Sequence, residues 1–255
     1  MAWWAPLSHS FASFRQLALV FVAGLAKLVS KQAQLRAILG RIRRVSKNVF
    51  FDLRYGGFLG GTRASSAQEI GGVEAGNSDY DALQAIFANL DIDGRVIADV
   101  GAGRGRVANF ILDNFNPKKI ILIEYDRRIA SKLHRRLGHR KNVIVKNGDF
   151  RSVSLDNIDV FYLFNPFDKN LMIDFIHQLP SIFDYIIYYN PARLFCFSDQ
   201  EFEVSYLLKN HAEYHDCVLI RRRGAGRAAL ALGKGHLKSG SSAPRGQVKA
   251  LSGSR

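Results

Sequence analysis

The chain has few of the features that mark disulfide-rich, metal-binding or membrane-spanning proteins. Only two of its 255 residues are cysteine, Cys196 and Cys217, and both lie in apolar stretches. This count excludes a disulfide framework, and we expect both side chains to be reduced and to lie in the core. His211, His215 and Cys217 have the chemistry of metal ligands. No further cluster accompanies them, so we predict no metal site.

Long apolar runs are also missing. The run at 17–26 holds ten residues, whereas a helix needs about 20 to cross a bilayer. Residues 1–10 contain no Lys or Arg, which argues against a secretory signal, because such a signal begins with positive charge. The sequence therefore predicts neither a membrane span nor an exported protein.

Acidic residues are absent from both ends of the chain. The net charge is +14, yet residues 1–50 hold eight Lys and Arg and no acid, and residues 218–255 hold nine and no acid. The part between them, 51–217, holds 19 basic and 22 acidic residues. An enzyme that modifies nucleic acid usually carries basic surface around its active site. The distribution therefore argues mildly against a nucleic-acid substrate, unless the basic ends bind it.

The first 50 residues are apolar and basic, and we predict a helical segment that lies at a membrane surface. After the apolar run come six basic residues: Lys31, Arg36, Arg41, Arg43, Arg44 and Lys47. Such a flank favours an anionic cytoplasmic leaflet, and Trp3 and Trp4 are candidate interfacial anchors. A helix that packs on the core or on a partner is the alternative.

The opposite end gives less information. Residues 224–255 are rich in Gly, Ser, Ala and basic residues without periodicity, which predicts a disordered tail. The tail could tether nucleic acid or have no selected function. The sequence thus divides into a basic apolar segment at 1–50, a folded domain at 51–223 and a tail at 224–255.

What the folded domain does contain is a strand, a glycine turn and a helix, in the stretch IADVGAGRGRV at 97–107. The strand ends in Asp99, and Gly101, Gly103 and Gly105 follow. Such a turn before a helix N-terminus forms a cradle for a nucleotide-sized ligand, because glycine lets the backbone approach closely. Arg106 stands where a dinucleotide fingerprint has its third glycine. The pattern therefore does not require a bound pyrophosphate.

Apolar strands and amphipathic helices alternate after this turn, as in a parallel sheet. We predict helices at 106–114, 127–137 and 171–179, and strands at 119–124, 142–146, 158–164, 185–189 and 214–221, with 201–208 a helix or a strand. Several strands end in polar residues: Glu124, Asp149 after a short turn, and Asn165. These ends meet at one edge of a parallel sheet, where ligands bind.

The glycine turn with Asp99 resembles motif I of the class I S-adenosylmethionine (SAM) methyltransferases. Glu124, Asp149 and the Asn165-Pro-Phe strand end follow in the family's order, and the resemblance covers about residues 75–220. The stretch Asp52-x-x-Tyr55-Gly56 is similar to a bacterial group of these enzymes with no defined substrate. The resemblance implies an α/β fold: a Rossmann-like, seven-stranded, mostly parallel sheet with helices on both faces and a terminal β-hairpin.

The resemblance also implies a cofactor, SAM, and a role for each strand end. The glycine turn would hold the methionine part, with the acid before it ordering the turn, and the acids of the next two strands would bind ribose and adenine. The implied cofactor-binding residues are Asp99, Gly101, Ala102, Gly103, Gly105, Glu124, Asp149 and Phe150. A solvent-facing Glu124 and an ordinary turn at Gly148-Asp149 are the alternatives.

The catalytic residues implied by the resemblance are Asn165, Pro166 and Phe167. They are similar to the [Asn/Asp]-Pro-Pro-[Tyr/Phe] motif of methyltransferases that act on amino nitrogens, with one proline missing. The Asn165 amide oxygen and a nearby carbonyl could accept hydrogen bonds from an amino group, and Phe167 could stack on a planar substrate or the sulfonium. A turn that merely ends the strand is the alternative.

The sequence thus predicts a SAM-dependent methyltransferase that acts on an amino nitrogen of an unidentified acceptor. A protein amine, a small-molecule amine and a sugar amine of a membrane-linked glycan all fit. A non-catalytic SAM-binding scaffold, a methyltransferase of protein or nucleic acid and a nucleotide-sugar or NAD enzyme are the alternatives. Cytosolic SAM implies a cytoplasmic protein, peripheral to the inner face of the membrane if the anchor holds. The oligomeric state is not predicted.

Two further features have open interpretations. The glycine-rich stretch 55–61 and the loop around Gly71 and Gly72 form either a lid over the cofactor or a linker. Arg104 and Arg106 lie in the glycine turn, where they contact cofactor or substrate or face solvent, and the last of these is favoured.

Overall fold

The computed structural model describes residues 31–32, 34–35, 38–57, 59–60, 66–73 and 77–224. The chain divides into two compact units, residues 1–51 and 52–255. The anchor residues Trp3 and Trp4, the apolar run at 17–26 and the tail after residue 224 lie outside the described residues. The predictions for these parts stay predictions.

The described part of the first unit is helical. Residues 31–32, 34–35 and 38–51 are in helical conformation, and the helix continues to residue 54 in the second unit. Its large apolar side chains are more than half exposed: Leu35, Ile38, Leu39, Ile42, Val45 and Phe50. Within the described residues, no helix has the length and apolar character that crossing a bilayer requires.

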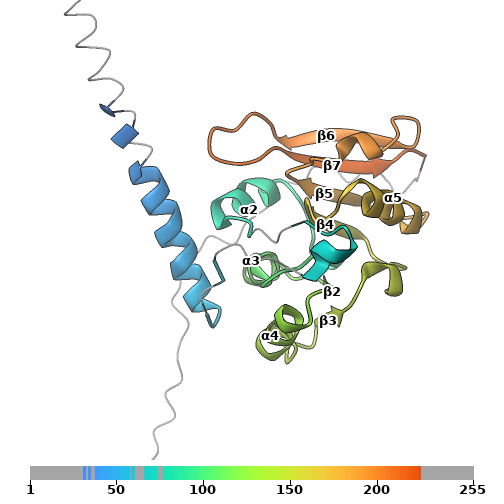
Figure 1. Ribbon diagram of the computed structural model, residues 1–255, viewed down its shortest axis with the longest axis horizontal. Coiled ribbons are helices and arrows are strands. Elements are labelled where there is room, and N and C mark those ends of the chain that lie inside the picture. Colours follow the sequence, from blue (N-terminus) through green and yellow to red (C-terminus); the bar gives the residue numbers. More distant parts are fainter. Residues whose placement is uncertain are drawn as a thin grey trace, which may run out of the picture. The chain divides into compact units, whose positions relative to one another are not determined.

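The second unit contains a seven-stranded sheet with helices on both faces (Figure 1). The strands are β1 Val96–Val100, β2 Lys119–Glu124, β3 Val143–Asn147, β4 Val160–Phe164, β5 Tyr185–Tyr189, β6 Phe202–Leu208 and β7 Cys217–Arg222. The helices are α2 Tyr80–Phe87, α3 Arg106–Asn114, α4 Arg127–Leu137 and α5 Lys169–Gln178. Three short 3-10 helices are η1 Ser66–Ile70, η2 Phe150–Ser152 and η3 Leu194–Cys196.

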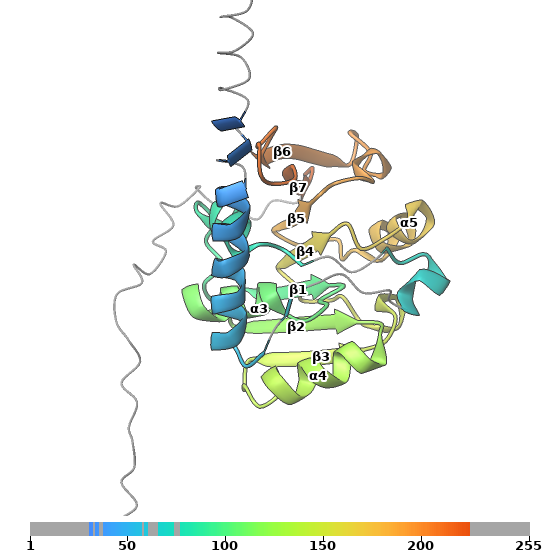
Figure 2. The same cartoon turned by 60° about the vertical axis from the view of Figure 1, so that its left-hand side comes forward.

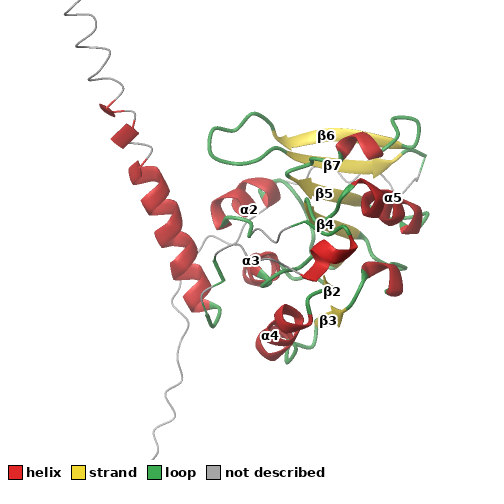
Figure 3. Ribbon diagram, in the orientation of Figure 1, coloured by secondary structure: helices red, strands yellow, loops and turns green. Residues whose placement is uncertain are grey.

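The strand order is β3-β2-β1-β4-β5-β7-β6 (Figures 2 and 3). The first five strands pair in parallel, whereas β7 pairs antiparallel with both β5 and β6. The predicted seven-stranded, mostly parallel sheet with a terminal hairpin is therefore confirmed. The segment at 201–208, for which the sequence left helix and strand open, is the strand β6.

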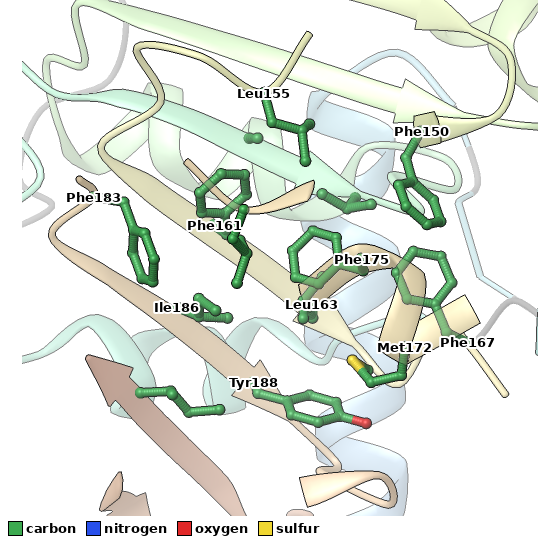
Figure 4. Packing of buried hydrophobic residues seen from close by; sticks show 14 of the residues in the cluster. Phe150, Leu155, Phe161, Leu163, Phe167, Met172, Phe175, Phe183, Ile186 and Tyr188 are labelled. Carbon is green, nitrogen blue, oxygen red and sulfur yellow. The ribbon is translucent and has the colours of Figure 1, made fainter. Parts of the chain in front are cut away.

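The helices cover the sheet because its central strands are apolar on both faces. Tyr162 of β4 faces α2, where its ring lies 6.1 Å from that of Phe87. Its neighbours Phe161 and Leu163 belong to the core cluster under α5, which Figure 4 shows with Phe175. This alternation buries every residue from Val160 to Leu163, as expected for an internal parallel strand.

Element ends differ from the sequence expectations where a side chain bonds to the backbone. The helix expected from residue 171 begins at Lys169, because the Asp168 carboxylate accepts the N–H of Leu171 at 2.9 Å and caps it. The strand expected from 158 begins at Val160, because the Asp159 carboxylate accepts the N–H of Val96 at 2.8 Å.

Candidate active site

The candidate site lies where the strand order reverses. Strand β1 has β2 on one side and β4 on the other, and the helices α3 and α5 lie on opposite faces of the sheet (Figure 1). In open α/β sheets, such a reversal leaves a crevice at the carboxyl ends of the strands. The strand ends at this point carry Asp99 within β1 and Gly101 after it, Glu124 at the end of β2 and Asn165 after β4.

The glycine turn needs glycine at each of its three positions for conformational reasons. Gly101, Gly103 and Gly105 have φ of 80°, 53° and 75°, a region that other residues rarely adopt. A Cβ at Gly101 would lie 3.0 Å from Cβ of Pro166, so the turn and the β4 strand end are in close approach. The N–H groups of Gly101 and Ala102 both donate to the carbonyl of Ile123, at 2.9 and 3.0 Å.

Gly105 has a second reason to be glycine. A Cβ there would collide with the Leu133 side chain of α4 and would lie 3.4 Å from Leu137. The start of α3 therefore packs directly on α4 at this residue. In this structure Gly105 serves helix packing, and its role in cofactor binding stays a prediction.

Glu124 is buried, with 5 % of its surface exposed. Its Oε2 accepts the N–H of Gly103 at 2.8 Å, and its Oε1 accepts the N–H of Asp126 at 2.9 Å. Burial raises the pKa of Glu124, while the N–H donors of Asp126 and Gly103 act in the opposite direction. The side chain thus bridges the end of β2 to the glycine turn, and the alternative of a solvent-facing Glu124 is excluded.

Asp99 is also buried, and one of its carboxylate oxygens is unpaired. The residue is 3 % exposed, and Oδ2 has no hydrogen-bond partner. Burial, and then the nearby Glu124, raise the pKa of Asp99 to about 8. A buried acceptor without a donor is rare in folded proteins. Asp99 thus lies buried at the reversal point of the sheet, next to the glycine turn that follows β1.

Asp149 and Phe150 follow β3 and have different environments. The Asp149 carboxylate caps η2 and forms an ion pair with Arg151 at 2.6 Å. Burial would raise the pKa of Asp149, but hydrogen bonds from Arg151 outweigh it and lower the pKa. Phe150 is buried, and its ring lies 4.7 Å from that of Phe167 (Figure 4).

The Asn165-Pro166-Phe167 strand end is folded tightly into the domain. Asn165 has φ of 41°, and its Oδ1 accepts the hydroxyl of Tyr188 at 3.4 Å. The carbonyl of Pro166 accepts the N–H of Val73 at 2.9 Å. Phe167 is 6 % exposed and packs against Phe150. Its ring belongs to the core, and the expected stacking on a substrate stays a prediction.

One cavity, of about 70 Å³, joins these strand ends. Six of the predicted site residues line it: Gly101, Glu124, Asp149, Phe150, Pro166 and Phe167. Five others do not: Asp99, Ala102, Gly103, Gly105 and Asn165. Of these, Gly103 contacts a lining residue through its hydrogen bond to Glu124.

The segment 66–73 covers this cavity, as the lid interpretation expected for its second half. Ala67, Ile70, Gly72 and Val73 line the cavity, and Gly72 pairs with Phe167 as an isolated antiparallel bridge. The first half of the expected lid behaves differently. Two of its described glycines, Gly56 and Gly57, line another cavity.

The sequence analysis missed a buried ion pair beside the turn. Arg106, for which solvent exposure was favoured, is 5 % exposed and donates to Asp52 through Nε at 3.0 Å and Nη2 at 2.6 Å. Asp52 is fully buried, and it also accepts the hydroxyl of Tyr80 at 3.2 Å. The expectation for Arg106 is therefore wrong. The Asp52-x-x-Tyr-Gly stretch was the available signal, since it places an acid ahead of the turn.

The donor set fits SAM better than it fits a metal ion. A Cβ at Gly101 would lie 3.0 Å from Pro166, so the backbone there is open to close approach, and Glu124 presents a buried carboxylate that lines the cavity. Across the described residues, no three His, Cys, Asp or Glu side chains gather in a way that could hold a metal ion.

No family model and no curated protein matches this chain. Solved structures with a similar fold include an RNA methyltransferase from Salinibacter ruber in complex with S-adenosyl-L-homocysteine, at 16% identity over 57% of this chain and 92% of that chain, with a TM-score of 0.45. Another is Aeropyrum pernix fibrillarin with natively bound S-adenosyl-L-methionine, at 14% identity, 56% and 76% coverage and a TM-score of 0.44. A third is an rRNA methylase from Streptococcus thermophilus, at 12% identity, 55% and 92% coverage and a TM-score of 0.40.

Proposed function

We propose that this protein is a SAM-dependent methyltransferase of the bacterial group with the Asn-Pro-Phe strand end, acting on an amino nitrogen of an unidentified acceptor. The observation that carries the proposal is the Glu124 carboxylate. It is buried at the reversal point of the sheet, holds the glycine turn through Gly103, and lines one cavity with Asp149 and Pro166. Of the similar structures above, one is an RNA methyltransferase, one is an rRNA methylase and one holds bound S-adenosyl-L-methionine.

Each strand end has a role in this proposal. Glu124 accepts the two ribose hydroxyls. It can keep the hydrogen bonds from Gly103 and Asp126 at the same time, because each carboxylate oxygen has more than one lone pair. Asp149 and Phe150 border the adenine. SAM, when bound, supplies an activated methyl group, so the protein contributes mainly orientation and exclusion of water.

Asn165 orients the acceptor. Its Oδ1 accepts only the 3.4 Å hydrogen bond from Tyr188, which is long, and a lone pair remains for a substrate N–H. The Pro166 carbonyl already accepts from Val73, and it too retains a lone pair. The missing second proline of the motif therefore removes neither acceptor from the strand end.

The cavity must enlarge before SAM can enter. Its volume of about 70 Å³ is well below the range of about 300–1,000 Å³ that is usual for ligand sites. We expect the segment 66–73 to move. It is held on the strand end by the Gly72–Phe167 bridge and by backbone bonds at Gly71 and Val73, and these contacts lie outside the seven-stranded sheet. SAM binding should therefore change the hydrogen-exchange rates of the backbone amides in this segment. Hydrogen exchange measured with and without SAM tests this expectation.

Titration calorimetry of the full chain with SAM, and with NAD as a control ligand, tests the cofactor. Glu124→Gln should weaken SAM binding by at least about tenfold, because a charge-assisted hydrogen bond contributes about 1.5–3 kcal/mol. The matched control Glu203→Gln changes an exposed acid on the edge strand β6 and should leave the affinity unchanged. Tighter binding of NAD than of SAM would overturn the proposal.

A transfer assay separates an enzyme from a SAM-binding scaffold. Radiolabelled SAM is incubated with the protein and with fractionated protein, small-molecule and glycolipid extracts. For an acceptor found in this way, Asn165→Ala should keep the SAM affinity and lose most of the transfer rate. Binding of SAM without transfer to any fraction would instead favour the non-catalytic alternative.

A separate observation supports contact with an anionic membrane on the cytoplasmic side. The described helical residues from 38 to 54 expose apolar side chains at helical spacing, such as Ile38 and Ile42, together with basic residues such as Arg41 and Arg43. A basic amphipathic helix binds an anionic interface through both its apolar area and its charge. We therefore propose that this helix is peripheral to the inner face of the membrane.

Co-sedimentation with vesicles tests this contact. Ile38→Asp/Ile42→Asp should abolish binding to vesicles that contain phosphatidylserine. The control Ile182→Asp changes a side chain in the second unit that is equally exposed, at 56%, and should bind as the parent does. If the double variant binds vesicles normally but changes the mass of the protein in solution, the helix instead pairs with a second copy.

A further inference from the structure

A second cavity lies on the other side of the glycine turn. Its volume is about 570 Å³, and it shares no lining residue with the cavity at the strand ends. Arg104 of the turn lines it, whereas Gly101 of the same turn lines the first cavity. This second cavity lies between the stretch at 56–59 and the helix α4. The proposed methyl transfer therefore does not use it.

The walls of this cavity are strongly basic. Five cationic side chains line it: Arg104, Arg128, Lys132, Arg135 and Arg136. None of the described residues that line it is acidic. The remaining lining residues are two glycines and the apolar Leu59, Ile129 and Leu133. The lining thus combines five positive charges with three apolar side chains.

Four of the five cations belong to the helix α4, and the fifth, Arg104, belongs to the glycine turn. Residues 127–141 hold seven of the 19 basic residues of the region 51–217 and none of its 22 acids. Arg128, Lys132 and Arg136 recur at intervals of four on α4, so they share one face of the helix. Like charges at this spacing repel and destabilise a helix. A bound anion on this face would relieve the repulsion.

Two of the arginines are held in place at the cavity wall. The Arg136 guanidinium donates to the carbonyl of Arg104, and Arg104 donates to the carbonyl of Gly60. Nε of Arg136 is buried and has no hydrogen-bond partner. A buried guanidinium donor without an acceptor is costly. An anion bound at the adjacent Arg136 guanidinium nitrogens would lower this cost by balancing the charge of the group.

We infer that the cavity between α4 and the 56–59 stretch binds the phosphate groups of a small polyphosphorylated ligand. Guanidinium groups match the geometry of phosphate oxygens and bind two of them at once. The volume is within the range of small-molecule sites, which favours a compact ligand over an extended nucleic-acid strand. A free polyphosphate and a nucleoside triphosphate share this chemistry. The apolar wall would contact only the second.

Calorimetry of the full chain with tripolyphosphate tests the site. The double variant Arg128→Gln/Lys132→Gln removes two exposed lining charges, and it should weaken binding by at least about tenfold, since each charge-assisted contact to phosphate contributes roughly a factor of ten or more to the affinity. The matched control Arg127→Gln/Arg140→Gln removes the same charge from α4 and its loop but from residues that do not line the cavity. The control should change the affinity by less than about threefold, because exposed charges at a distance are screened by salt.

Further arms identify the ligand and separate it from the proposed function. ATP that binds more tightly than tripolyphosphate would assign the apolar wall to a nucleoside, and equal affinity would assign the site to free polyphosphate. SAM titrated into the same variants should bind as in the parent, and it would report failure of the cofactor proposal independently. An equal loss of tripolyphosphate affinity in both double variants, or binding of an RNA oligonucleotide with none of tripolyphosphate, would overturn the inference.

Discussion

The buried pair of Asp52 and Arg106 should be a large single contributor to stability. Substitution of Asp52 by alanine removes an acceptor of four hydrogen bonds, from Nε and Nη2 of Arg106, the N–H of Leu59 and the hydroxyl of Tyr80. The Arg106 guanidinium would keep its hydrogen bond to the carbonyl of Ser78, at 3.1 Å. With 5 % of its surface exposed, it has little access to water in exchange.

The expected loss follows from this geometry. Breaking a buried ion pair by removing one partner costs about 3–5 kcal/mol, because the remaining charge stays buried. We therefore expect Asp52→Ala to lower the free energy of unfolding by that amount, a large share of the roughly 5–15 kcal/mol of an ordinary domain. The control Asp174→Ala removes an ion pair with Arg151 that is 3.4 Å long and about half exposed, and it should cost less than about 1 kcal/mol.

Urea denaturation of the full chain, followed by circular dichroism, measures both values. The double substitution Asp52→Leu/Arg106→Leu should recover part of the loss of Asp52→Ala, since it leaves no unpaired charge. The reasoning would be refuted if Asp52→Ala cost no more than Asp174→Ala. It would also be refuted if the stability lost by the double variant equalled the sum of the losses of Asp52→Leu and Arg106→Leu measured singly, since the two residues would then be independent.

Three further predictions follow from the described contacts. The pKa of Asp99 is about 8 in the folded protein, against 3.8 for the free side chain. Between these pH values the folded state binds a proton that the unfolded state does not, so the parent should lose stability as the pH rises from about 4 to about 8. Asp99→Asn should remove this pH dependence of the unfolding free energy, measured by urea denaturation across the same range. Gly105→Ala should lower the free energy of unfolding by about 2–4 kcal/mol, because of both its positive φ and its collision with α4. Gly103→Ala should lower it by only about 1 kcal/mol, because its Cβ would lie 4.0 Å from the carbonyl oxygen of Gly101, which is an ordinary contact. A thiol reagent added to the native protein should modify Cys196 but not the buried Cys217, and titration of two thiols without denaturant would contradict the burial.

The strand ends could be predicted from the sequence because their signal is local. A continuous apolar run that stops at an acid, as at Glu124, fixes both a buried strand and the polar residue at its carboxyl end. The order of such units along the chain then implies one sheet edge. The bounds of α3, α4, β2 and β5 followed from the same patterns.

The interior of the site could not be predicted in this way. The pairing of Arg106 with Asp52 joins residues 54 positions apart, and no local period connects them. The packing of Phe167 against Phe150 depends on how η2 and α5 meet, and the sequence alone does not reveal this contact. The net charge of residues 51–217 did not predict the basic cavity beside α4, because it averages the basic residues of that helix with acidic residues elsewhere.

The two cavities beside the glycine turn have opposite electrostatic character, and this difference bears on which ligand each accepts. At the strand ends, the carboxyls of Asp99 and Glu124 are buried close enough for Glu124 to raise the pKa of Asp99. A pyrophosphate placed there would add negative charge to a site that already disfavours its own, whereas SAM brings a positive sulfonium and an ammonium group that would relieve it. Across the turn, the cations of α4 favour phosphate for the same physical reason. The charge arrangement therefore supports SAM over NAD at the strand ends and assigns any phosphorylated ligand to the other side.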